Sequence, residues 1–247
     1  MIIRKSMEKS SYDIEWKVED SHWWFVVRKK LLKSILSSIH FPSQGVTLDI
    51  GCGVGSNLKI LESAGLRTVG LDRSIYALTL AKRKLHLPFI NGDLNKLPFR
   101  SQSVGLIIAA DVLEHLENDI TGIRECYRVL EKRGILILTV PAFKFLWGIQ
   151  DIAASHKRRY SRQEILDKLS HEGFDIVRSS YFNFFLFLPI LVARRLMHLL
   201  GLKIESENEI NSPLINFFLK TIFSVEPHLL KYFPLPFGVS IYCIAKR

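Results

Sequence analysis

A glycine-rich loop that follows an apolar run is the feature that most constrains the fold of this chain. Residues 46–50 are apolar and β-prone, and a helical pattern begins at Ser56. Between them lie three alternating glycines, Gly51, Gly53 and Gly55. Glycine allows a sharp backbone turn, and the absent side chains let a ligand lie against the backbone. This strand–loop–helix order predicts an α/β fold that binds a nucleotide at the carboxyl edge of a sheet.

The spacing of this loop differs from that of a dinucleotide-binding loop. In the pattern Gly-x-Gly-x-x-Gly the third glycine would fall at Ser56, whereas this chain has Gly55. Asp49 stands two residues before the loop, where a carboxylate would repel a pyrophosphate but suit a cationic ligand. Both departures disfavour a nicotinamide-dependent oxidoreductase, which remains the alternative enzyme class.

Two further acids follow the next strand patterns along the chain. Asp72 closes the apolar run 68–71, and Asp93 follows the run 89–90. A carboxylate at the position of Asp72 can accept hydrogen bonds from both ribose hydroxyls. A carboxylate at the position of Asp93 can reach an adenine edge. Either acid alone could equally be an ordinary turn residue. Three acids at strand ends, in register with one glycine loop, predict a nucleoside-binding site.

Apolar strand patterns alternate with helical patterns through most of the chain, which is typical of a doubly wound, mostly parallel α/β sheet. We expect strands at residues 46–50, 68–71, 89–90, 104–110, 135–140, 174–180 and 237–245. We expect helices at residues 56–64, 74–85, 119–131 and 161–173. With 247 residues, the chain has a length common for one α/β domain.

Two segments fall outside this alternation. Residues 1–45 form an aromatic, helical extension ahead of the predicted cofactor-binding core at 46–181. Residues 182–236 are apolar, helical in pattern and interrupted by prolines, and the last strand pattern at 237–247 follows them. We therefore expect a single domain with an N-terminal helical extension and a helical insertion before the last strand.

The order of these motifs resembles that of class I S-adenosylmethionine-dependent methyltransferases. The similarity covers about residues 45–180 and includes the segment Asp111-Val-Leu-Glu-His115. The chain is most similar to the broad methyltransferase type 11/12 group, which implies a seven-stranded Rossmann-like sheet and S-adenosyl-L-methionine as cofactor. By this resemblance the glycine loop holds the methionine part, the acid after the second strand the ribose, and the residues after the third strand the adenine. The implied cofactor contacts are Asp49, Gly51, Cys52, Gly53, Gly55, Asp72, Arg73, Asp93, Leu94 and Asp111.

The N-terminal sequence also resembles one bacterial subset of these enzymes. It contains the run His22-Trp-Trp-Phe25, followed by Arg28. In similar enzymes an N-terminal helix covers the cofactor, so we expect residues 1–45 to form a helical lid. Packing alone would also account for these aromatic side chains.

Candidate catalytic groups follow the fourth and fifth strand patterns. Methyl transfer is an in-line displacement, so alignment and exclusion of water can supply most of the rate, and a general base is needed only when the acceptor must lose a proton. The candidate groups are His115, His156 and Tyr160. Alternatively, His115 is an ordinary helix histidine. The basic run 157–159 beside Tyr160 could hold an anion or be a solvated turn.

A metal site is the alternative use of the segment after the fourth strand. Asp111, Glu114 and His115 share one face of a helical turn, so two of them could point into one cleft. Such a set could bind a divalent cation. Because only a minority of similar motifs need a metal, we expect none.

The charge balance favours anionic partners. The chain has 34 Lys and Arg residues against 24 Asp and Glu, a net charge of +10. An excess of this size attracts nucleic acid, anionic lipid or phosphorylated substrates. The sequence contains no recognisable RNA-binding appendage and no motif for methylating base amines, so nucleic acid is the disfavoured partner. RNA methylation remains an alternative function beside transfer to a small or lipid-linked acceptor.

The insertion suggests contact with a membrane surface. Its most apolar stretch, residues 181–193, is shorter than the about 20 residues that span a bilayer, and it contains Asn183 and Pro189. The pattern is apolar on all sides and ends at Arg194-Arg195, as in interfacial segments. We expect a helical cap that closes the acceptor pocket and touches an anionic membrane peripherally. An ordinary hydrophobic lid is the alternative.

The expected location is the cytoplasm. Three well-separated cysteines, Cys52, Cys126 and Cys243, form no paired framework, which fits a reducing compartment. The first residues lack the pattern of a signal peptide. A cytoplasmic protein that touches the membrane from that side is consistent with all of these features.

Overall fold

The computed structural model describes residues 9–39, 45–199 and 212–247. Seven strands form one sheet in the order β3-β2-β1-β4-β5-β7-β6. They are β1 (Val46–Ile50), β2 (Thr68–Asp72), β3 (Phe89–Asn91), β4 (Val104–Ala110), β5 (Leu130–Pro141), β6 (Asp175–Phe182) and β7 (Ser240–Lys246). Strand β7 is antiparallel to both of its neighbours, and all other pairs are parallel. The predicted doubly wound, mostly parallel seven-stranded sheet is confirmed.

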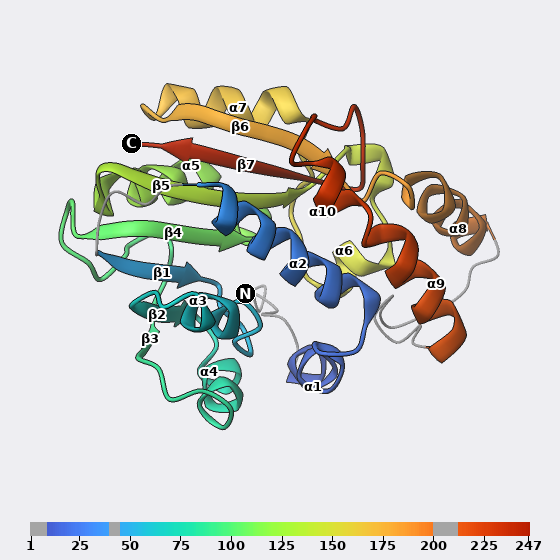
Figure 1. Cartoon of the computed structure of the whole chain (residues 1–247), viewed down its shortest axis with the longest axis horizontal. Helices are drawn as coiled ribbons and strands as arrows, with labels where there is room; N and C mark the ends of the chain where they lie inside the picture. The colour runs from blue at the N-terminus through green and yellow to red at the C-terminus, as the bar shows by residue number, and fades with distance from the viewer. Residues whose placement is uncertain (1–8, 40–44, 200–211) are drawn as a thin grey trace, which may run out of the picture.

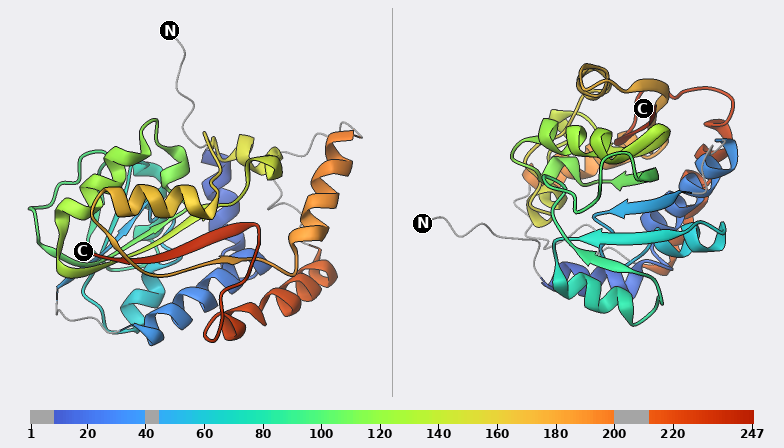
Figure 2. Two further views of the ribbon diagram at one scale, coloured as in Figure 1. Left: turned by 90° about the horizontal axis from the view of Figure 1, so that it is seen from above. Right: turned by 90° about the vertical axis from the view of Figure 1, so that its left-hand side faces the viewer.

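Helices cover both faces of this sheet (Figures 1 and 2). One face carries α5 (Asp119–Val129) and α7 (Arg162–His171). The other carries α2 (Trp23–Ser38), α3 (Leu58–Ser63), α4 (Ile75–Lys82), α9 (Pro213–Phe223) and α10 (Glu226–Leu229). Helix α1 (Lys9–Val18) packs on α4, while α6 (Ile149–Ala153) and α8 (Phe187–Leu199) lie toward the carboxyl ends of the strands. Two short 3₁₀ turns, η1 (Leu113–His115) and η2 (Lys144–Leu146), complete the described elements.

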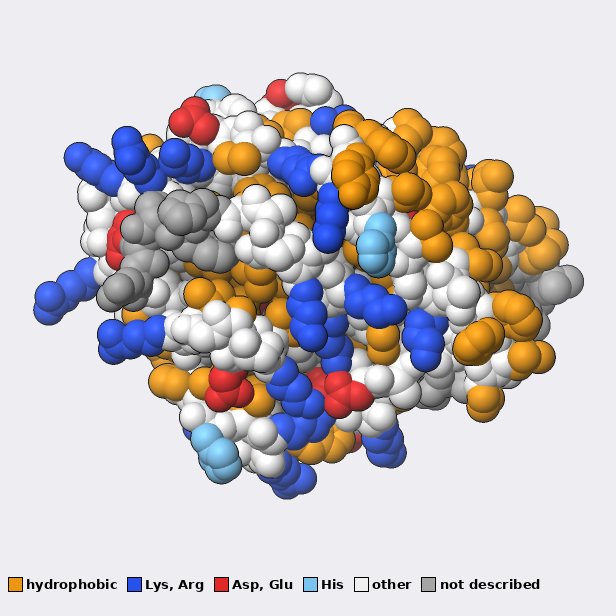
Figure 3. Space-filling view, in the orientation of Figure 1, with side chains coloured by type: hydrophobic (Ala, Val, Ile, Leu, Met, Phe, Trp, Pro, Cys, Tyr) orange, Lys and Arg blue, Asp and Glu red, His pale blue; other side chains and the backbone are white. Residues whose placement is uncertain are grey.

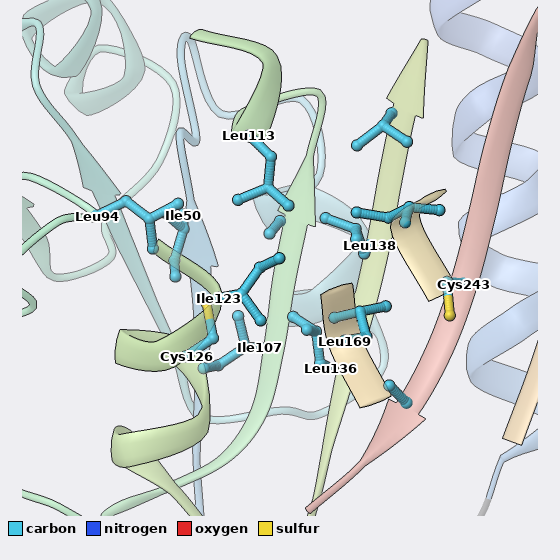
Figure 4. Packing of buried hydrophobic residues seen from close by; sticks show 14 of the residues in the cluster. Ile50, Leu94, Ile107, Leu113, Ile123, Cys126, Leu136, Leu138, Leu169 and Cys243 are labelled. Carbon is cyan, nitrogen blue, oxygen red and sulfur yellow. The ribbon is translucent and has the colours of Figure 1, made fainter. Parts of the chain in front are cut away.

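The central strands are apolar along their whole length because each face meets its own core. On β4, Ile107 points to the face of α5 and α7, together with Leu136 of β5 (Figure 4). The neighbouring Leu106 and Ile108 point to the opposite face, together with Ile137. This alternation follows from the two-residue period of a strand. A parallel sheet with two buried faces therefore explains why the sequence shows continuous apolar runs.

The observed boundaries differ by a few residues at several elements, and the differences are largest in two places. Strand β5 begins at Leu130, five residues before the expected start, because Leu130 already pairs with Val104 ahead of a register shift. In the insertion, α8 begins only at Phe187, after Asn183 adopts a φ of 60°. The expected insertion otherwise corresponds to α8, α9 and α10, and its residues 200–211 lie outside the described ranges. Within those ranges, every helix is too short or too polar to cross a bilayer.

Candidate active site

The glycine loop leaves β1 at the carboxyl edge of the sheet and is fixed to the end of β2. The backbone N–H of Gly51 donates to the carbonyl of Leu71 at 2.7 Å. Gly51 and Gly53 have φ angles of 67° and 52°, a left-handed conformation that side chains disfavour. A Cβ atom at Gly51 would lie 2.5 Å from Cγ2 of Val112. The loop therefore needs glycine both for its conformation and for its close contact with the segment after β4.

Asp49 is the buried acid that precedes this loop. Its side chain is fully buried, and within the described chain neither carboxylate oxygen has a hydrogen-bond partner of standard geometry. Burial raises its pKa to about 7, the nearby amide of Asn57 opposes this shift, and the charge of Asp72 adds to it. Burying a carboxylate without a partner is costly. A cationic group such as the α-ammonium of a methionine moiety would remove that cost, so Asp49 fits the predicted cofactor.

Asp72 joins the loop to the next strand. One carboxylate oxygen accepts a hydrogen bond from the N–H of Gly53 at 2.8 Å, and the other accepts from the N–H of Ser74 at 2.7 Å. Burial raises the pKa of Asp72, while these backbone hydrogen bonds oppose the shift. Each oxygen keeps a further lone pair that can accept from a hydroxyl. These two hydrogen bonds fix the carboxylate, and its contact with the ribose stays a prediction.

The remaining predicted cofactor contacts lie around this centre. Arg73 Nε is 3.6 Å from Asp93 Oδ2, and the two side chains are 64% and 40% exposed. Asp93 also accepts hydrogen bonds from the backbone and side chain of Asn95, so it closes a turn. The side chains of Leu94 and Cys52 are buried in the two cores, which leaves their backbone atoms for a ligand. These four positions stay predictions, Cys52 for the methionine part and the other three for the ribose and adenine end.

Helix α1 contributes an acid that no sequence motif marks. Oε1 of Glu15 lies 3.6 Å from the position of a Cβ at Gly53, so this carboxylate faces the loop. Burial raises the pKa of Glu15 to about 7, and the charge of Glu19 adds to the shift. Glu19 is buried and ion-paired with Lys84. With the acids of β1 and β2, Glu15 makes a strongly anionic pocket that suits a sulfonium cofactor and disfavours a pyrophosphate.

Arg28 on α2 connects the N-terminal extension to the segment after β4. Its guanidinium lies over the ring of Trp24 at 5.3 Å, and Nη2 is 2.8 Å from Asp111 Oδ2. The other oxygen of Asp111 accepts a hydrogen bond from the hydroxyl of Thr139 at 3.0 Å. Asp111 thus braces α2 against β5. Its predicted contact with the cofactor stays a prediction.

A second cluster lies just beyond Asp111, where Glu114, His115 and His156 come together. One ligand atom from each residue lies within 4.8 Å of the other two. The two imidazole rings are 4.9 Å apart between centroids. His156 Nδ1 is 2.8 Å from Oδ1 of Asp151, and its Nε2 is 3.7 Å from Oε1 of Glu114. Two of the three predicted catalytic residues, His115 and His156, therefore share one site.

The charges in this cluster are set by burial and by Asp151. Burial lowers the pKa of His115 to about 4, and the neighbouring His156 adds to the shift. Burial raises the pKa of Glu114 well above its usual range, and the charge of Asp111 adds to it. Burial alone would raise the pKa of Asp151 as well, but its partners His156 and Arg159 hold it at about 2. Asp151 is therefore anionic and fixes the Nδ1–H of His156.

The third predicted catalytic residue lies elsewhere. Tyr160 is fully buried in the core between the sheet, α5 and α7. Its hydroxyl donates to Asp119 Oδ2 at 2.9 Å, and its backbone forms a bridge with Ala142 at the end of β5. The ring is buried and its hydroxyl is engaged by Asp119, which supports a structural role for Tyr160. Its catalytic role stays a prediction.

The basic run before Tyr160 is bound internally, which argues against the expected anion site. Lys157 is ion-paired with Glu117. Arg158 donates to two backbone carbonyls that follow η1, at 2.9 and 2.8 Å. Arg159 is buried and donates to Asp151 at 2.8 Å. Lys157 and Arg158 hold the segment after α6 against the segment after β4, and Arg159 fixes Asp151, the partner of His156.

The cap is attached to both parts of the site. Asn216 of α9 accepts a hydrogen bond from the N–H of Trp23 at 2.6 Å, at the start of α2. On α8, Arg194 was expected at an exposed basic rim, but its side chain is 8% exposed. Its Nη1 donates to the carbonyl of Leu146 and lies 3.9 Å from Asp151 Oδ2. Arg194 therefore anchors α8 beside the histidine cluster.

Comparison with known proteins identifies the family. Residues 48–138 match the family model described as a methyltransferase domain. The chain is 30% identical over 196 residues to an uncharacterized protein of Methanocaldococcus jannaschii, an alignment that covers 68% of this chain and 73% of that protein. It is also 30% identical over 135 residues to 2-methyl-6-phytyl-1,4-hydroquinone methyltransferase of Arabidopsis thaliana, covering 53% of this chain and 39% of the plant protein. Mycobacterial relatives described as probable S-adenosylmethionine-dependent methyltransferases are covered over 51% of their length.

Solved structures agree in fold. A putative sarcosine dimethylglycine methyltransferase from Galdieria sulphuraria superposes with a TM-score of 0.64 at 15% identity, covering 96% of this chain and 97% of that one. Its fold extends over the whole domain, beyond the residues that match the family model. Sequence, topology and the anionic glycine-loop pocket thus agree, and the chain belongs to the type 11 family of class I S-adenosylmethionine-dependent methyltransferases.

Proposed function

We propose that this methyltransferase acts on a small acceptor with an apolar part, which it takes from an anionic membrane surface. The observation that carries the proposal is an exposed apolar surface on the cap. This surface lies within the described part of residues 185–233. Its most exposed large side chains are Leu188, Val192, Leu196, Leu199, Leu214, Phe217, Phe218 and Tyr232, each more than half exposed. Hydrophobic side chains gather at this end of the molecule in Figure 3. Exposed apolar patches of this kind mark interaction sites.

The charge beside this surface favours an anionic bilayer. Arg195 on α8 and Lys231 after α10 are exposed, and Figure 3 has several basic side chains next to the apolar area. The whole chain carries a net charge of +10. An interfacial segment gains apolar burial and roughly 1 kcal/mol for each basic residue near an anionic surface. Contact with such a surface would bring the enzyme to acceptors dissolved in the lipid.

The relative from Arabidopsis supports an acceptor of this kind. Its name describes a hydroquinone that carries a phytyl chain, so that protein acts on a polar ring with a long apolar tail. An acceptor of the same general form would place its tail along the cap and its polar group near His115 and His156. The anchoring of α8 beside this cluster supports that arrangement.

The reaction divides between the two parts of the site. The cofactor supplies a methyl group activated on a sulfonium sulfur. Asp49 and the loop backbone bind its methionine part, Asp72 binds the ribose, and the packing of α1 over the loop keeps water away from the reacting atoms. His115 and His156 orient the acceptor, and the proton that an oxygen or nitrogen acceptor loses passes to solvent. Most of the rate then comes from alignment.

Transfer of a labelled methyl group from S-adenosylmethionine into a cell extract tests this proposal. The extract is separated into lipid, RNA and protein fractions, and we expect the label in the lipid fraction. The matched control is Asp49→Asn, which should transfer no label. Label confined to RNA would overturn the proposal and favour RNA methylation, the second function that the net charge of +10 supports.

A further inference from the structure

We propose that Glu114, His115 and His156 bind a divalent transition-metal cation on the acceptor side of the site. One carboxylate oxygen and two imidazole nitrogens lie within 4.8 Å of one another. Such a set suits first-row divalent metals and leaves coordination positions open. The proposal replaces the sequence-based expectation of no metal. It also replaces Asp111 as a ligand, because Asp111 is engaged by Arg28 and Thr139.

The state of Glu114 is the first independent observation. Its side chain is fully buried, and among the described residues neither of its oxygens has a hydrogen-bond partner of standard geometry. Nε2 of His156 is 3.7 Å from Oε1 of Glu114, which is too long for a hydrogen bond. A buried carboxylate left in this state is costly. A cation between Glu114 and the two imidazoles would satisfy it.

The support behind His156 is the second observation. Nδ1 of His156 is 2.8 Å from Asp151 Oδ1, and Arg159 Nε donates to the same oxygen at 2.8 Å. The anionic Asp151 therefore accepts the Nδ1–H and leaves the lone pair of Nε2 directed at Glu114. Histidines that bind metals commonly donate their other N–H to a carboxylate in this way. The ring of His156 is thus held in the tautomer and orientation of a metal ligand.

The backbone holds the two segments of the cluster in register. The N–H of Lys157 donates to the carbonyl of Glu114 at 2.9 Å, so His156 lies beside η1. Metal bonds of about 2.1 Å would bring the ligand atoms to about 3–3.5 Å from one another, so the side chains must close by roughly 1 Å. His156 is 12% exposed and His115 is partly exposed, which leaves access for a cation and for an acceptor.

The cluster adjoins the cofactor loop, because Val112 contacts the backbone at Gly51. A cation there would bind an acceptor hydroxyl and lower its pKa, a role that rests on the proposed function. The hydroxyl proton passes to solvent. The oxygen electron pair then forms a bond to the methyl carbon while the carbon–sulfur bond breaks toward sulfur. The products are a methyl ether and S-adenosylhomocysteine.

Titration of the chelator-treated full chain with cobalt(II) chloride tests the site, by calorimetry and by the visible spectrum of bound cobalt. We expect one cation per chain. His156→Ala and Glu114→Gln should each lower its affinity at least a hundredfold. His171→Ala is the matched control, because His171 is 86% exposed on α7, and it should bind as the wild type does.

Melting temperatures distinguish loss of the site from loss of the fold. Cobalt should raise the melting temperature of the wild type and leave that of Glu114→Gln unchanged. A folded wild type that binds no cobalt, or a His156→Ala variant that binds it as the wild type does, would overturn the proposal. Cobalt binding is measured without methyl transfer. Failure of the metal proposal is therefore distinguishable from failure of the proposed function, which the labelling of lipid tests.

Discussion

The two sides of the site meet at one edge of the sheet but are built in different ways. On the cofactor side, backbone groups fix the loop, as when the N–H of Gly53 donates to Asp72. On the acceptor side, Glu114 and His156 come from separate segments that a backbone hydrogen bond joins, and a side chain, Asp151, orients the imidazole. A loop fixed by its backbone needs particular residues at adjacent positions. A cluster fixed by side chains needs only that distant residues meet.

Both sides nevertheless share one physical property. Each contains a buried carboxylate without a hydrogen-bond partner in the described chain, Asp49 on the cofactor side and Glu114 on the acceptor side. A protein that leaves such a group unpaired loses stability unless a ligand pairs with it. Under the two proposals a cation would pair with each carboxylate, the α-ammonium group of the cofactor on one side and a metal on the other.

The largest expected effect is that of Asp49→Asn on the cofactor side. Removing the charge should weaken S-adenosylhomocysteine binding at least a hundredfold, about 3 kcal/mol, because a hydrogen bond to a charged group is lost. The ligand-free variant should melt at a higher temperature than the wild type, because the unpaired buried charge is gone. Calorimetry and thermal denaturation measure the two effects. Unchanged affinity would remove Asp49 from the cofactor site.

A smaller loss is expected from Asp151→Asn on the acceptor side. Replacing the carboxylate that orients His156 should lower cobalt affinity about 10- to 100-fold, as expected for a residue behind a metal ligand. The affinity for S-adenosylhomocysteine should stay unchanged, because the backbone-built loop does not depend on Asp151. Equal losses of both affinities would break the distinction between the two sides.

The cofactor side should also respond to pH. Burial raises the pKa of Asp49 and of Glu15 to about 7, so below this pH both are largely protonated and receive a cationic ligand poorly. Affinity for S-adenosylhomocysteine should rise roughly tenfold from pH 6 to pH 8 if one of the two must be ionised. The stability of the ligand-free protein should instead fall as pH rises from about 4 to 7. An acid whose pKa is raised by burial destabilises the folded state when it becomes ionised in this range.

Calorimetry of Glu15→Gln and Asp49→Asn across this pH range identifies which acid controls the effect. The variant that removes the controlling acid should bind weakly and with little dependence on pH. An affinity of the wild type that is flat between pH 6 and pH 8 would contradict the role of both acids.

The smallest effect concerns the cap. Arg195→Gln should weaken sedimentation with anionic vesicles about fivefold, which corresponds to roughly 1 kcal/mol per basic residue near the surface. Binding to neutral vesicles should not change. Lys132→Gln, an exposed position in β5, is the matched control and should have no effect. Equal binding of the wild type to neutral and anionic vesicles would leave the cap as an ordinary hydrophobic lid.

The contrast between the two sides also explains what the sequence could predict. The strand–loop–helix at β1, the acids at the ends of β2 and β3 and the sheet itself depend on short-range patterns, and all were predicted to within a few residues. Glu15 was missed because its contact with the loop depends on how α1 packs. The burial of Tyr160 against Asp119 was missed because the two residues are distant in sequence. Asp151 likewise shows its role only through its contacts in the folded chain.

The position of Asp151 connects helix α8 of the cap with the histidine cluster. Its Oδ2 lies 3.9 Å from Nη1 of Arg194 in the cap, and its Oδ1 lies 2.8 Å from Nδ1 of His156 in the cluster. A displacement of α8 changes the electrostatic environment of the imidazole, and occupancy of the cluster changes the hold on α8. Thermodynamic linkage makes such coupling equal in both directions. If the cap docks on a bilayer as proposed, docking and occupancy of the histidine cluster would each change the free energy of the other through Asp151.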